Sequence, residues 1–131
     1  MECCLLTGLI IPNWETNTTL ESRLSHLNLF PLIRKCDDCV PYATIKATLS
    51  QGPVRTTDGD SSQVVVVFDM YDVMEEQERL SELMTELASE GPKWSANACS
   101  LEWCGGRLTG ATAAVSGDLL KATVSIRWNG S

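Results

Sequence analysis

The sequence is short of basic residues, of histidine and of long apolar runs. Its 131 residues include 10 Lys and Arg against 17 Asp and Glu, which gives a formal charge of −7. A protein that binds nucleic acid or an anionic membrane surface needs an excess of cations to contact phosphates, so the charge argues against both partners. The apolar run from Leu5 to Ile11 stops at Pro12 and is too short to insert into and cross a membrane.

The same run has no basic residue before it, because Glu2 stands where a secretory signal would carry Lys or Arg. We therefore expect an intracellular protein, cytoplasmic or carried in a virion if it is viral, with reduced cysteines. Apolar residues make up 44% of the chain, as in an ordinary globular protein. One domain over residues 1–131 is expected, large enough to bury a core without metal or disulfides.

The spacing of apolar residues predicts a mixture of strands and helices. Apolar runs over 2–11 and 64–68 are continuous, which is typical of strands buried on both faces. Thr18 with Glu21, and Asp72 with Glu75, match the pattern of helix-capping boxes. We expect strands over 2–11, 42–50, 64–68, 95–103, 107–115 and 119–128, helices over 18 to 27 or 29 and over 72–90, and a polar loop over 51–62.

This order predicts an α+β fold with two helices on one face of a mostly antiparallel sheet. The first six elements match a ferredoxin-like split βαβ-βαβ unit, in which the first and third strands are central. The two continuously apolar strands hold those positions. A C-terminal hairpin with Gly117 in its turn would then extend the sheet. The second sheet face must be covered by this hairpin or by a partner.

Four cysteines form the only candidate metal site. Cys36 and Cys39 have the spacing of a zinc knuckle, and Cys99 and Cys104 could supply two more thiolates. Asp37 and Asp38, between the first two cysteines, would add negative charge to a site that is already anionic. A domain of this size also has enough apolar residues to form a core without a metal. Cys36-x-x-Cys39 also lacks the strand-to-helix context of a redox motif. We expect no cofactor, with zinc as the alternative.

Other motifs for chemistry are incomplete. Gly105 to Thr112 has the glycine spacing of a phosphate-binding loop, but Ala111 stands where lysine is required. His26 is the only imidazole, and most acids lie side by side on one helix face, not across a cleft. An RNA-binding sheet would need aromatic residues on its first strand, which has none. We therefore expect no catalytic residues and no enzyme.

Charge and aromatic side chains mark candidate partner-binding residues. The segment 72–90 holds seven of the 17 acids and one base, so it concentrates the negative charge. Large aromatics in connections either clamp the edge of a core or anchor in a pocket of a partner. The candidates are Glu75, Glu78, Glu82 and Glu86 on the helix and Trp14, Phe30 and Trp94 in connections.

Three features resemble the barrel-forming subunits of the Mediator head. They are the opening Glu2-x-x-Leu5-Leu6-x-Gly8 strand, the Leu-Glu-Ser-Arg-Leu helix segment from Leu20 to Leu24, and the strand–helix–hairpin order. The resemblance implies a barrel subunit of a multi-subunit complex.

The sequence thus predicts a non-catalytic structural or interaction subunit of a larger assembly, such as a virion. It would contact other protein subunits through its sheet face or edge, as an oligomer or a hetero-complex. One alternative is a free acidic interaction or inhibitor protein that occupies a basic partner surface through helix 72–90. A small enzyme would instead need a deep pocket with converging polar groups.

Overall fold

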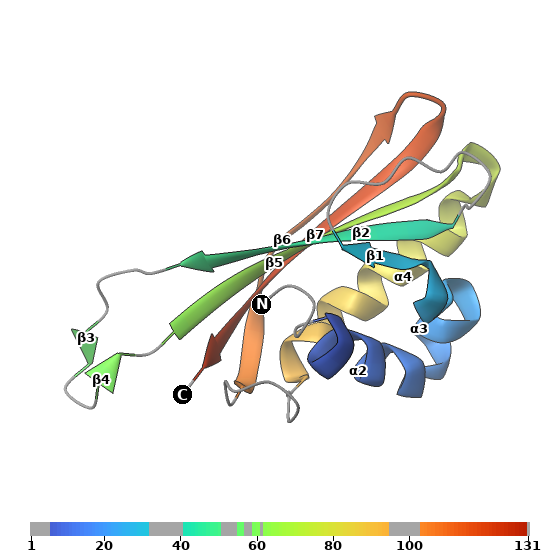
Figure 1. The fold of residues 1–131 in the computed structure, drawn as a ribbon. Coiled ribbons are helices and arrows are strands. Elements are labelled where there is room, and N and C mark those ends of the chain that lie inside the picture. The colour runs from blue at the N-terminus through green and yellow to red at the C-terminus, as the bar shows by residue number, and fades with distance from the viewer. Residues whose placement is uncertain are drawn as a thin grey trace.

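A five-stranded mixed sheet with helices packed on one side forms the body of the protein (Figure 1). The computed structural model describes residues 6–31, 41–50, 55–56, 59–60, 62–94 and 103–130. Within these residues the predicted α+β class, with helices on one face of the sheet, is confirmed.

The strand β5 lies in the middle of the sheet, as its run of valines predicts. The spatial order is β1-β2-β5-β7-β6; β1 is parallel to β2 and every other neighbouring pair is antiparallel. A separate pair, β3 and β4, forms part of the segment predicted as a polar loop. The strands are β1 (Leu29–Pro31), β2 (Tyr42–Ser50), β3 (Arg55–Thr56), β4 (Gly59–Asp60), β5 (Ser62–Val73), β6 (Trp103–Ser116) and β7 (Leu119–Gly130).

The helices come from two parts of the chain and pack against each other on the same side of the sheet (Figure 1). The first group is η1 (Leu6–Ile10), α2 (Ile11–Thr16), α3 (Thr18–Arg23) and η2 (His26–Asn28). The second is η3 (Met74–Glu76), α4 (Gln77–Glu90) and η4 (Gly91–Lys93).

The predicted first strand over 2–11 is wrong over its described part. Residues 6–10 form a π-helix that continues into α2, and Leu9 and Ile10 are fully buried in it. A short apolar run fits a buried helix as well as a buried strand, and Pro12 suits the first turn of a helix. The ferredoxin-like order requires a central strand in this part of the chain, and the described residues do not show one. The ferredoxin-like order is therefore not confirmed and stays a prediction. In the opening segment of the Mediator-head resemblance, residues 6–8 likewise lie in this π-helix and not in a strand, while residues 2–5 lie outside the described residues.

Both predicted helix starts need correction. The side chain of Asn17, not Thr18, caps α3 by accepting the backbone N–H groups of Thr19 and Leu20 at 3.0 and 3.2 Å. This helix ends at Arg23, earlier than predicted. Asp72 caps no helix: it is the fully buried residue before the last one of β5, and α4 begins five residues later, after η3.

The remaining strand predictions hold closely where they are described. Strand β2 covers the predicted 42–50, while β5 and β7 contain the predicted 64–68 and 119–128. Gly117 turns the β6–β7 hairpin with a positive φ of 65°. Strand β6 contains the predicted 107–115 and starts earlier, at Trp103; residues 95–102, predicted as most of another strand, lie outside the described residues.

The core lies between the sheet and the helices and is built around three tryptophans. Trp14 and Trp128 are fully buried, and Trp94 is 6% exposed. The Trp94 ring lies between the other two, stacked on Trp128 and edge-on to Trp14, each with 6.4 Å between ring centroids. The Trp14 indole N–H donates to the carbonyl of Leu24 at 2.7 Å, which ties the first helices together.

Candidate functional site

Strand β6 is an exposed edge of the described sheet. Every residue from Arg107 to Val115 is exposed, and Leu108 to Val115 contains no charged residue and no proline. An edge strand presents unpaired backbone N–H and C=O groups, and proteins usually protect such edges with charge or proline. Along Leu108 to Val115 the pairing of β6 with β7 is interrupted by one bulge, between Leu108 and Gly110, and is regular from Gly110 onwards. The strand can therefore pair with a strand of another chain.

A small apolar groove lies beside this edge, between α4 and the β6–β7 hairpin. Its volume is about 130 Å³, well below the roughly 300–1,000 Å³ of small-molecule sites. It is lined by Gln77, Leu80, Ser81, Met84, Ala113, Leu120 and Ala122. Val115, 61% exposed, follows on the same side of β6 as Ala113. The size suits one or two side chains of a protein partner better than a substrate.

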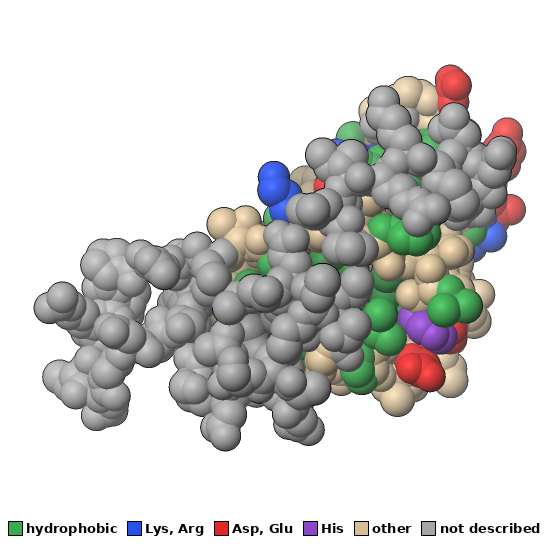
Figure 2. Space-filling view, in the orientation of Figure 1, with side chains coloured by type: hydrophobic (Ala, Val, Ile, Leu, Met, Phe, Trp, Pro, Cys, Tyr) green, Lys and Arg blue, Asp and Glu red, His purple; other side chains and the backbone are tan. Residues whose placement is uncertain are grey.

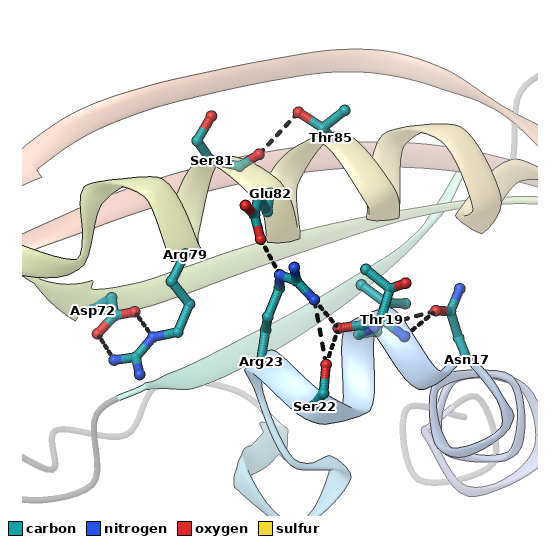
Figure 3. Close-up of polar contacts among 10 residues, drawn as sticks. Asn17, Thr19, Ser22, Arg23, Asp72, Arg79, Ser81, Glu82 and Thr85 are labelled. Atoms are coloured by element: carbon teal, nitrogen blue, oxygen red, sulfur yellow. Dashed lines mark hydrogen bonds and ion pairs between the residues drawn. The ribbon is translucent and has the colours of Figure 1, made fainter.

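Several acids of the helix layer are engaged within the chain (Figure 3). Arg79 donates two hydrogen bonds of 2.6 Å to the carboxylate of Asp72, and this contact raises the pKa of Arg79 above its ordinary value. Arg23 forms an ion pair with Glu82, and Glu86 accepts a hydrogen bond from Asn17. The Glu75–Arg79 pair that i,i+4 spacing suggests is replaced by Asp72–Arg79. These contacts join α3, α4 and the end of β5.

We expect Asp72→Asn to lower the free energy of unfolding by about 1–3 kcal/mol, because the buried carboxylate accepts charge-assisted hydrogen bonds from Arg79. Urea denaturation measures the loss. Glu82→Gln is the matched control: it makes the same acid-to-amide change in a solvent-exposed pair and should cost less than about 1 kcal/mol. Equal losses would mean that burial of Asp72 contributes nothing.

The predicted partner-binding residues separate into three groups. Glu75 and Glu78 are exposed, and no ion pair within the described residues engages them. Glu82 and Glu86 are engaged as described above. Trp14 and Trp94 are buried in the core, which fits the role of a clamp at the edge of the core and leaves their rings unavailable as anchors in a partner's pocket. Phe30 is half-buried, with its ring 6.4 Å from that of Tyr42.

The candidate zinc ligands cannot be placed together from this structure. Cys36, Cys39 and Cys99 lie outside the described residues, and Cys104 is described only as part of the backbone of β6. Among described residues no three His, Cys, Asp or Glu side chains gather as metal ligands do. His26 approaches Glu21, with 2.8 Å between Nδ1 and Oε1, and Figure 2 shows this lone histidine in purple beside an acidic side chain. The zinc site stays a prediction.

The side chains that alternate with the core-facing ones lie on the opposite face of the sheet, which is called the open face here; of these, Tyr42 and Thr44 are buried. Strand register places successive cross-strand rows of side chains on it. At one end Tyr42 stacks on Tyr71 with 4.9 Å between centroids, and the Lys121 ammonium lies 5.9 Å from the Tyr71 ring. Towards the other end lie Lys46, Arg107 and Arg127, which form the basic patch. Sequence reasoning missed it because these residues come together only once the strand order is known.

Comparisons with known proteins give structural matches only. No family model matches the chain, and no curated protein matches its sequence. A chain from a structure described as the virion of a native gene transfer agent particle matches with a TM-score of 0.70 and 8% identity, covering 96% of this chain and 93% of that one. A second solved structure, known by a sequence identifier alone, matches with a TM-score of 0.58 and 12% identity over 86% of this chain and 91% of its own. At these identities the likeness establishes a shared fold. As a separate finding on the structure, no described helix has the length and apolar character that a membrane span requires.

Proposed function

We propose that this protein is a non-catalytic structural subunit of a virion or virion-like particle that binds a neighbouring subunit through the edge strand β6. The observation that carries the proposal is the exposed, uncharged edge from Leu108 to Val115. In a chain of net charge −7, an edge of this length without a charge leaves the backbone open to pairing.

The groove beside β6 supports the same proposal. A strand added to this edge would continue the sheet, and its alternate side chains would lie on the helix side, next to Ala113 and Val115. The backbone would supply affinity through hydrogen bonds, while the groove would select the side chain that enters it. The fold shared with a virion chain is a further argument for a structural role.

Two observations weigh against the alternatives. An acidic inhibitor that used the whole of helix 72–90 would need all of its carboxylates available, yet Asp72, Glu82 and Glu86 are committed to contacts within the chain and only the start of the helix keeps exposed, unpaired acids among the described residues. The groove beside α4 is smaller than a substrate pocket, so this part of the described structure gives no support to the enzyme alternative.

The test is incorporation into particles isolated from the native source. Mass spectrometry of the purified particles should find the chain at a fixed ratio to the other structural proteins. The double variant Ala111→Lys/Val115→Lys places two charges on the edge and should reduce incorporation about tenfold or more, while the circular dichroism spectrum stays that of the wild type.

Thr16→Lys is the control for added charge, because Thr16 is exposed on α2, away from the edge. It should be incorporated as the wild type is. A chain found only outside particles would contradict the structural role, and normal incorporation of the double variant would contradict the role of β6.

A further inference from the structure

The open face carries a concentration of positive charge that the molecule does not neutralise. Arg107 on β6 lies directly opposite Arg127 on β7. Lys46 lies one cross-strand row away on β2, which β5 separates from β7, and Asp69, which pairs with Lys121, lies in the row beyond it. Like charges directly opposite each other on neighbouring strands are destabilising. Within the described residues none of the three takes part in an ion pair, and the buried Nε atom of Arg127 has no hydrogen-bond partner. The patch is therefore suited to an anionic partner.

The same chain also carries exposed acidic residues close together in sequence. Glu75, Glu76 and Glu78, at the start of the second helix group, form the acidic end. All three are exposed and, among the described residues, none forms an ion pair; Glu76 acts on Arg79 only through a longer-range attraction. Figure 2 shows separate acidic side chains along the side of the molecule where β5 leads into η3.

The two surfaces are too far apart to neutralise each other within one molecule. Arg127 pairs with Val65, and the acidic end begins after Val73. Eight residues of strand separate these points, or about 26 Å. Charges in solution are screened over about 8 Å at physiological ionic strength. Their complementarity can act only between molecules.

We infer that the basic patch of the open face binds the acidic end of a second copy of this chain. Such a contact joins two different surfaces, so it can repeat from copy to copy and close a ring or extend a filament. This inference deepens the proposed function by naming a partner, but it concerns the sheet face and not the β6 edge. Self-association is tested with purified protein and without particles. The test can therefore fail while the proposed role of β6 in a particle holds, and the reverse.

Sedimentation of the purified protein over a range of concentrations is the test. At about 20 mM salt the average mass should rise with concentration, and at about 500 mM salt it should return to that of one chain. The charge-reversed variants K46E/R107E/R127E and E75K/E76K/E78K should each associate with themselves at least about tenfold more weakly than the wild type.

Mixing the two variants is the decisive step. One variant then carries two acidic surfaces and the other two basic ones, so the equimolar mixture should recover the wild-type association. K46E/R107E, which changes only exposed residues, replaces the triple variant if substitution of half-buried Arg127 prevents folding. A wild type that stays monomeric, variants that associate normally, or a mixture without recovery would overturn the inference. So would a basic patch that binds duplex DNA while the average mass stays that of one chain.

Discussion

Replacing Trp128 with alanine should lower the free energy of unfolding by about 3–5 kcal/mol. The indole is fully buried in β7, stacks on Trp94, and lies edge-on to Phe68 with 6.2 Å between centroids. Its N–H donates to the carbonyl of Gly91 at 3.1 Å, at the point where α4 gives way to η4. The substitution therefore removes contacts between the sheet, the last helix and the connection that follows it.

Trp128→Phe separates the two contributions and keeps the measurement possible if the alanine variant does not fold. Phenylalanine retains most of the buried ring and removes one of the two donors to the Gly91 carbonyl, which still accepts the backbone N–H of Trp94. The loss of this hydrogen bond should therefore cost about 0.5–1.5 kcal/mol. Urea denaturation followed by circular dichroism gives both values. Losses below about 1 kcal/mol for the alanine variant would mean that the tryptophan cluster is not the centre of the core.

Leu83→Asp should lower the free energy of unfolding by about 3–5 kcal/mol or more, because it places an unpaired charge in the core. Leu83 is fully buried on the face of α4 that also presents Leu80 and Leu87. The control is Ser81→Asp, which adds the same carboxylate at an exposed position of the same helix.

The control should change the free energy of unfolding by no more than about 0.5 kcal/mol. Thermal and urea denaturation of both variants give the comparison. Similar stability of the two would show that the packing face of α4 has been assigned wrongly.

Much of the sheet could be predicted from sequence because its strands carry strong local patterns. Tyr42–Ser50 alternates with period two, and the valines of β5 favour a central strand, since β-branched side chains pack well on both faces. Gly117 occupies a turn position that needs a positive φ. In each case the local preference and the final fold agree.

The errors occurred where tertiary contacts decide the structure. A short apolar run such as residues 6–10 can be buried in a strand or in a helix, and here Leu9 and Ile10 join the same buried core as Trp14 from a helix. Asp72 has the spacing of a helix cap, but the guanidinium of Arg79 binds its carboxylate instead. Strand β1 is only three residues long and is held by its parallel pairing with β2. Its own sequence is too short to show the alternation that predicts a strand.

The candidate site divides in the same way. The absence of charge from 108 to 115 can be read directly from the sequence, but only the strand order shows that this segment is an edge. The basic patch combines residues from three strands separated by up to 81 positions in sequence, from Lys46 to Arg127. A linear sequence carries no signal for such a grouping.

The place of β7 in the sheet has a consequence for how the protein is made. This strand is the last in the described chain, yet it lies between β5 and β6 and supplies one side of the pairing for both. While the ribosome is still synthesising residues 119–130, the longest strands of the sheet have no partner on that side. The β5–β7 contacts also join distant parts of the chain, which slows their formation. The nascent chain therefore stays incompletely folded until this strand has emerged, with its apolar strands accessible to chaperones throughout.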